Sequence, residues 1–191
     1  MRDFLMEHSY NMVKLFLNQI GLTVFGTMLA LATAQNDTLL LISSIFSILF
    51  FLVLNYTVGW ELGAKDKIRI DAGRLAPMPA KGFFIALGAN LPNLILALLM
   101  GIGIIINTQK SVEMSLVCNA IARLLNGMYL GTIKLLQDAL SADITSVWWW
   151  FIIITFPALF VGWLSYYLGS KNFRILSIFG INPKPTGMTK K

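Results

Sequence analysis

The sequence predicts an all-α polytopic membrane protein, a bundle of transmembrane helices, from three observations. Of its 191 residues, 57% are apolar and only 13% are charged, about half the charged share of an ordinary soluble domain. The mean hydropathy is +0.72, and four long stretches contain no charged residue. Disordered chains need low hydrophobicity and high charge, and a soluble globule needs more charges to cover its surface. A disordered chain is therefore excluded, and a soluble globule is disfavoured.

Four spans are predicted from the lengths of the uncharged stretches. A helix needs roughly 20 residues with few charges to cross about 30 Å of hydrocarbon at about 1.5 Å per residue. The uncharged stretches have that length and cover residues 15–34, 39–58, 82–106 and 147–169. The sequence thus indicates one integral membrane domain, residues 1–191, that crosses a membrane several times.

A further stretch, residues 112–136, is apolar on average but contains charged side chains. Its polar residues Asn119, Arg123 and Asn126 recur at spacings of four and three, which is typical of an amphipathic helix. A charge at the centre of a bilayer costs at least about 2.5 kcal/mol, and an interfacial or re-entrant helix avoids that cost. We expect an amphipathic or re-entrant segment here, with a fifth span as the alternative.

The distribution of basic residues predicts the orientation. With four crossings both termini share one side, and that side carries twelve of the fifteen Lys and Arg residues. A fifth crossing would move the five basic residues of the C-terminal end to the other side and weaken this bias. The positive-inside rule therefore predicts four crossings with both termini cytoplasmic.

Two charged segments are predicted outside the spans. Residues 170–191 form a basic tail, and residues 59–81 are expected to be a basic cytoplasmic loop with five basic and three acidic residues. The loop is interpreted either as a solvated segment that anchors the topology or as a docking surface. A docking surface would attract a cytoplasmic protein or anionic lipid headgroups, at about 1 kcal/mol per basic residue. The residues expected to form it are Lys65, Lys67, Arg69 and Arg74.

Amide side chains inside the spans are the candidate binding residues. Asn18 and Asn55 lie in the first two spans, and the third contains Asn90 and Asn93 around a proline. Buried amides in lipid need hydrogen-bonding partners. They are interpreted either as contacts that hold helices together or as a polar pocket for a small solute. Arg123 adds either a site for an anionic group or a side chain that reaches a lipid phosphate.

The motifs give little support for catalysis or for metal binding. One His and one Cys are too few for a zinc site of the Cys/His kind. Gly-rich phosphate loops, His-Glu-x-x-His and Gly-x-Ser-x-Gly are absent from the sequence. We expect no enzyme activity, no cofactor and no metal.

Lipid is the expected partner. The net charge is +6, but the basic residues lie between apolar stretches, which favours membrane lipids over nucleic acid.

Small residues four apart, such as Gly26 with Ala30 and Ala158 with Gly162, indicate close helix packing. We expect that packing within the chain, and contact with a second copy is the alternative.

Parts of the chain resemble a known kind of protein. The segment from Gly59 to Arg74, the Asn-Leu-Pro-Asn sequence that begins at Asn90, and residues 162–169 resemble a pattern in uncharacterised small polytopic membrane proteins of Gram-positive, clostridial-type bacteria. This resemblance implies a bacterial plasma membrane and no activity. Residues 63–74 are also similar to a cytoplasmic loop of major facilitator transporters, with different spacing. The first span resembles that of the six-helix substrate-binding subunits of energy-coupling-factor vitamin transporters.

These observations predict two functions. The leading one is a non-enzymatic membrane component that acts through protein or lipid contacts, with residues 59–81 as its docking surface. The alternative is a small-solute transporter, or the substrate-binding subunit of a transporter complex. Its binding residues would be Asn18, Asn55, Asn90, Asn93 and Arg123.

Overall fold

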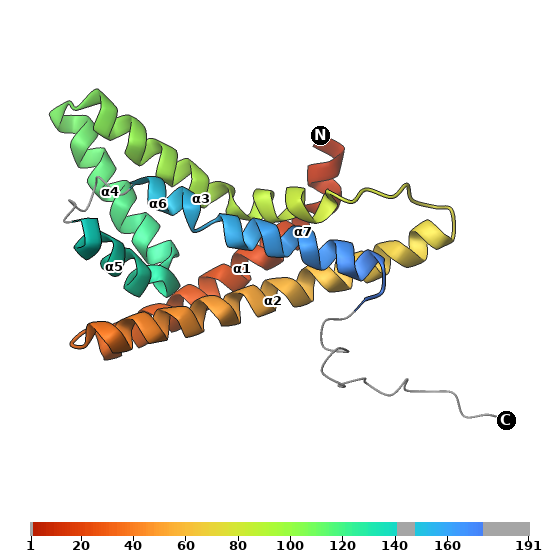
Figure 1. Ribbon diagram of the computed structural model, residues 1–191. Helices are drawn as coiled ribbons and strands as arrows, with labels where there is room; N and C mark the ends of the chain where they lie inside the picture. The colour runs from red at the N-terminus through yellow and green to blue at the C-terminus, as the bar shows by residue number, and fades with distance from the viewer. Residues whose placement is uncertain (1, 141–147, 174–191) are drawn as a thin grey trace.

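The computed structural model describes residues 2–140 and 148–173, and within these it is all-α with no strand. Helices α1 (Arg2–Thr33) and α2 (Asp37–Asp71) form a long antiparallel hairpin, and α3 (Lys81–Ile106) packs against it. Helix α7 (Phe156–Ser170), preceded by the short α6 (Trp148–Ile153), lies along α2 (Figure 1). We call the end of the bundle with residues 34–36 the turn end, and the end with residues 72–80 the loop end.

Four helical segments of this bundle are long and apolar enough to cross a membrane. They are Met6–Thr33, Asp37–Asp71, Lys81–Ile106 and Trp148–Ser170. The predicted fold class is therefore confirmed, because the four predicted spans fall within these four segments, apart from residues 34 and 147 at their edges. The count rises to five if a bent helix pair, described below, is taken as one more span.

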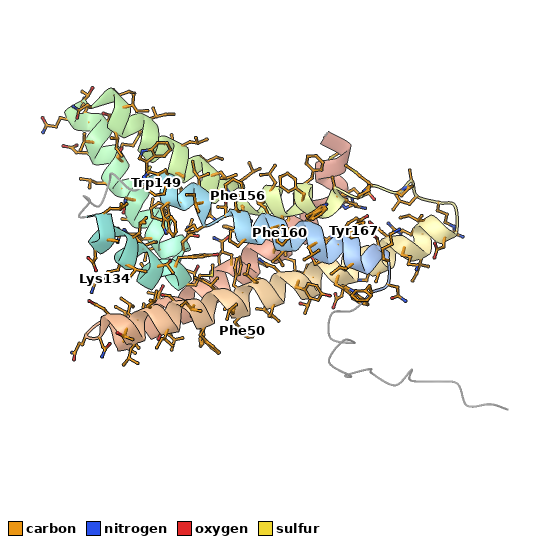
Figure 2. All side chains as sticks on the ribbon, in the orientation of Figure 1. Phe50, Lys134, Trp149, Phe156, Phe160 and Tyr167 are labelled. Atoms are coloured by element: carbon orange, nitrogen blue, oxygen red, sulfur yellow. The ribbon has the colours of Figure 1, made fainter. Side chains whose placement is uncertain are left out.

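The outer surface of the bundle is apolar. Phe50 on α2 and Phe156 and Phe160 on α7 point away from the bundle (Figure 2) and are largely exposed. The outward face of α1 is similar, with exposed Leu17 and Leu31. Water would not tolerate so much contiguous apolar surface, whereas lipid covers it. These faces support an integral membrane protein.

The segment predicted to be amphipathic or re-entrant is a broken helix. Helix α4 (Gln109–Leu125) leads through the short η1 (Gly127–Tyr129) into α5 (Leu130–Leu140), and the two arms meet at 87°. Near its start, Ser115 donates a hydrogen bond of 3.2 Å to the Met100 carbonyl of α3. In the other arm, Lys134 pairs with Asp37 at the start of α2 (Figure 2). Such a bend is that of a re-entrant pair or of one broken span, and we call these helices the re-entrant pair because both arms extend toward the turn end.

Glycines allow the tip of this pair to enter the bundle. A Cβ added at Gly26 of α1 would lie 2.5 Å from the Met128 Cα, and one added at Gly127 would overlap the Thr27 hydroxyl. Gly131 likewise lies against the Leu40 carbonyl of α2. Gly26 is seven residues from the end of α1, so the tip reaches about 10 Å into the bundle from the turn end.

The predicted loop 59–81 is largely helical, which corrects that expectation. Helix α2 continues to Asp71, so that the loop covers only residues 72–80. Helix α7 supports the extension by close packing, since a Cβ added at Gly63 would overlap the Tyr166 carbonyl oxygen. Trp60 also donates a hydrogen bond of 2.8 Å to the Phe173 carbonyl. Most of the predicted basic tail, residues 174–191, lies outside the described residues.

Candidate functional site

A chain of amide side chains runs through the middle of the bundle. Asn126, at the break between α4 and η1, donates a hydrogen bond of 3.2 Å to Asn93 on α3. Asn93 donates to Asn90 at 3.3 Å, and Gln19 on α1 donates to Asn126 at 3.4 Å. All four residues are buried. The chain therefore links α1, α3 and the tip of the re-entrant pair through neutral polar groups.

Side chains of α1 also donate hydrogen bonds to the backbone carbonyl at the break between α4 and η1. A helix end leaves carbonyl oxygens without intrahelical partners, and in lipid such groups must find partners inside the protein. The Leu125 carbonyl accepts hydrogen bonds from Thr23 at 2.6 Å and from Gln19 at 3.2 Å. The broken helix is thus held in the bundle by specific contacts.

A small cavity lies beside the amide chain, between α1, α2, α3 and α7. Its polar lining consists of Gln19, Asn55 and Asn90, and the rest of its lining is apolar or glycine. Its volume is about 10 Å³, which is enough for a single water molecule. The Asn55 side chain is 5% exposed, and its Oδ1 has no hydrogen-bond partner among the described residues. The cavity thus presents an unused acceptor to its occupant.

A larger groove opens between α1 and α2 at the loop end, with a volume of about 620 Å³. That volume is in the range of small-molecule pockets. Charged side chains of both signs line it, three basic and three acidic. They are Lys14, Lys65 and Arg69, and Glu7, Glu61 and Asp66. The groove also includes His8, which is buried.

Several of these charges are paired with one another. Lys14 and Glu61 face each other across the groove at 3.8 Å. Asp66 lies 2.7 Å from the Lys81 ammonium at the start of α3 and accepts a hydrogen bond of 2.9 Å from the Tyr166 hydroxyl of α7. The Asp66 and Lys81 side chains are almost completely buried. This Asp66–Lys81–Tyr166 cluster joins α2, α3 and α7 at the loop end.

One turn of α2 separates the groove from the cavity. Val58 lines the groove and Asn55 lines the cavity, and three residues along a helix correspond to about 4.5 Å. Val58 packs with Leu15, Ile85 and Ala89 in a buried apolar cluster, and Leu15 also lines the cavity. We call Leu15, Val58 and Ile85 the apolar barrier. The two hollows are therefore close neighbours that share this packed cluster.

The structure brings together only some of the candidate binding residues. Asn55, Asn90 and Asn93 gather in or beside the amide chain. Asn18 is half-buried and does not line the cavity, whereas its neighbour Gln19 does. Arg123 lies on α4 and does not line the cavity, and its Nε donates to Asn119 at 2.8 Å. The buried Arg123 Nη2 has no partner among the described residues.

The predicted docking residues differ in their exposure. Lys65 and Arg69 are exposed on α2 and line the groove, Lys67 is half-buried, and Arg74 is exposed in the loop after α2. The described residues hold no cluster of three or more His, Cys, Asp or Glu side chains that could bind a metal ion.

Several residues of the site were not among the candidate binding residues predicted from the sequence. Gln19 and Asn126 complete the amide chain, and Asp66, Lys81 and Tyr166 form the buried cluster. A signal existed for Asn126, because Gly127 and Gly131 follow it and are four residues apart, the spacing of close helix contacts.

No family model, no curated protein and no solved structure matches the chain.

Proposed function

We propose that the chain is a non-enzymatic integral membrane protein that binds and passes a small polar solute. It would act as a small transporter or as the solute-binding subunit of a transporter complex. The observation that carries this proposal is the position of the charged groove and the amide-lined cavity, one helical turn apart on the same face of α2. The groove would be the entrance, and the amide chain would be the polar centre.

The re-entrant pair supports this reading. Broken helices at membrane depth are tolerated where they are buried in protein or line a polar cavity, and transporters use such breaks to build binding sites. Here Asn126, at the break, is hydrogen-bonded to Asn93 and to Gln19, and Gln19 also lines the cavity. A bundle held together by apolar packing alone would not need this break.

The orientation follows from the positive-inside rule as a further part of the proposal. The loop end carries Lys65, Arg69 and Arg74, so we place it, and with it the groove, on the cytoplasmic side of a bacterial plasma membrane.

Uptake into proteoliposomes tests the proposal. Purified protein would be reconstituted and offered a panel of radiolabelled small solutes that includes neutral, zwitterionic and singly charged compounds. We expect faster uptake of at least one solute than in protein-free liposomes, and a loss of that uptake in Asn90→Leu. Asn18→Leu is the matched control, because Asn18 lies outside the cavity lining, and it should behave like the wild type. Equal uptake by protein-free and wild-type liposomes for every solute would overturn the proposal.

A second candidate function is contact with anionic lipid headgroups through the loop end. The observation that favours it is the exposure of Lys65, Arg69 and Arg74 in one region. Replacing these three residues by Glu should lower the number of phosphatidylglycerol molecules that remain bound in native mass spectrometry. Unchanged lipid retention would remove this candidate and leave solute passage untouched.

A further inference from the structure

We infer that the cavity at Asn55 accepts a small neutral hydrogen-bond donor of about the size of water, and that Leu15, Val58 and Ile85 form the closed barrier through which it arrives from the groove. This inference rests on the proposed function and names the chemical class of its solute. It depends on the lining, the size and the position of the cavity.

The lining selects a neutral occupant. Among the described residues no charged side chain lines the cavity, and its polar groups are the amides of Gln19, Asn55 and Asn90. An ion moved into such surroundings would lose its hydration without gaining an opposite charge. The acidic side chains of the groove do not accompany an ion into the cavity, because Asp66 is paired with Lys81 and Glu61 is paired with Lys14.

The orphan acceptor selects a donor. Asn55 Oδ1 is buried and has no hydrogen-bond partner among the described residues, although buried polar atoms almost always have one. An occupant that donates a hydrogen bond would satisfy it. The cavity volume of about 10 Å³ limits that occupant to roughly one water-sized molecule while the barrier is closed.

The barrier is thin and consists of side chains alone. Leu15, Val58 and Ile85 pack together, with Met12 and Leu62 at their margin. Val58 at the groove and Asn55 at the cavity are three residues apart on α2, a rise of about 4.5 Å. Shorter side chains at these positions would connect the groove to the cavity without a rearrangement of helices.

Stopped-flow light scattering on proteoliposomes tests the inference, with water and urea as neutral probes and potassium chloride as the charged probe. The opened variant is Leu15→Ala with Val58→Ala, and the milder Val58→Ala alone serves if the double variant does not fold. The matched control is Leu17→Ala with Val53→Ala, which shortens exposed side chains on the outer faces of the same two helices. Helical circular dichroism and a single gel-filtration peak would establish folding for each variant.

We expect a several-fold rise in the entry of water or urea for the opened variant, no rise for the control, and no rise in the entry of salt. Adding Asn55→Leu to the opened variant should abolish the gain. The inference is overturned if the opened variant behaves like the control, if salt enters in parallel with the neutral probes, or if Asn55→Leu has no effect. Asn90-dependent uptake of a charged solute would preserve the proposed function and refute this inference alone.

Discussion

The Lys81 ammonium lies 2.7 Å from the Asp66 carboxylate, and the two side chains are 4% and 3% exposed. The pair connects α3 to α2 across the loop of residues 72–80. The Tyr166 hydroxyl donates to the same carboxylate oxygen, so that α7 joins the contact. Three helices thus meet at one neutralised charge pair at the mouth of the groove.

Removing one charge of this pair should be strongly destabilising. Lys81→Met leaves the Asp66 carboxylate buried without its cation, and breaking a buried pair in this way costs about 3–5 kcal/mol. The free energy of unfolding in mixed micelles, from a denaturant titration, measures the effect. Lys65→Met on the exposed face of α2 is the control, and its effect should stay within about 0.5 kcal/mol.

Removing both charges should restore much of that stability. In Asp66→Asn with Lys81→Met no buried charge remains, and the Asn side chain still accepts the Tyr166 hydrogen bond. Replacing a buried ion pair by neutral groups is often close to neutral in stability. If the double variant is as unstable as Lys81→Met alone, the unpaired carboxylate is not the cause of the loss.

Two glycine-to-alanine substitutions should have opposite effects, because Gly63 lies in the contact between α2 and α7 and Gly21 faces open space. At Gly63 an added Cβ would overlap the Tyr166 carbonyl oxygen of α7, so Gly63→Ala should cost about 1–3 kcal/mol because the helices must separate. At Gly21 on α1 an added Cβ meets nothing within 4 Å. Gly21→Ala should therefore raise stability slightly, since Ala forms helices better than Gly by up to about 1 kcal/mol. Melting temperatures in detergent would show the two signs.

The spans were predictable because a helix that crosses lipid needs a long uncharged stretch of sequence. A stretch of about 20 uncharged residues has few alternatives to a membrane-crossing helix, and the long apolar faces of α1, α2, α3 and α7 bear this out. The charged region after the second span was harder. Asp66 and Lys81 look like solvated loop residues in sequence, because their burial depends on α3 starting beside α2 and on α7 covering both.

The presence of buried amides in the spans was predictable from the sequence, and so were some of the residues in or beside the amide chain. Amides in a span must find partners, which indicated Asn55, Asn90 and Asn93. Choosing between Asn18 and Gln19 requires knowing which face of α1 points inward. The re-entrant tip decides that, since Gln19 hydrogen-bonds to Leu125 and Asn126 while Asn18 is only half-buried. Periodicity within α1 alone is weak, because its outer face is as apolar as its core.

The two neighbouring amides of α1 therefore differ in their expected effects. Gln19→Leu removes hydrogen bonds to the Leu125 carbonyl and to Asn126, and at about 0.6 kcal/mol per bond in a membrane protein it should cost about 1 kcal/mol. Asn18→Leu should change stability by less than about 0.5 kcal/mol. Denaturant titration of both variants gives the comparison. A larger loss for Asn18→Leu would contradict the assigned face of α1.

Cysteine labelling would decide whether the broken helix crosses the membrane. In a Cys118→Ser background, single cysteines would replace Met78 in the loop at the loop end, Lys110 at the start of α4 and Asp138 near the end of α5, all exposed positions. A membrane-impermeant maleimide would be applied to intact cells and to inverted vesicles. The buried Ala97→Cys, at 0% exposure, provides the unlabelled control.

The re-entrant geometry predicts that positions 110 and 138 react from the same side. Lys134 pairs with Asp37 at the turn end, and α4 begins at Gln109, directly after α3 ends at Ile106, at the end of α3 opposite to Lys81. Position 78 should react from the opposite side. If the loop end faces the cytoplasm, as the basic residues indicate, position 78 is labelled in inverted vesicles and the other two in intact cells. Labelling of position 138 together with position 78 would mean that α4 and α5 form a fifth crossing, and would move the C-terminal end of the chain to the other side.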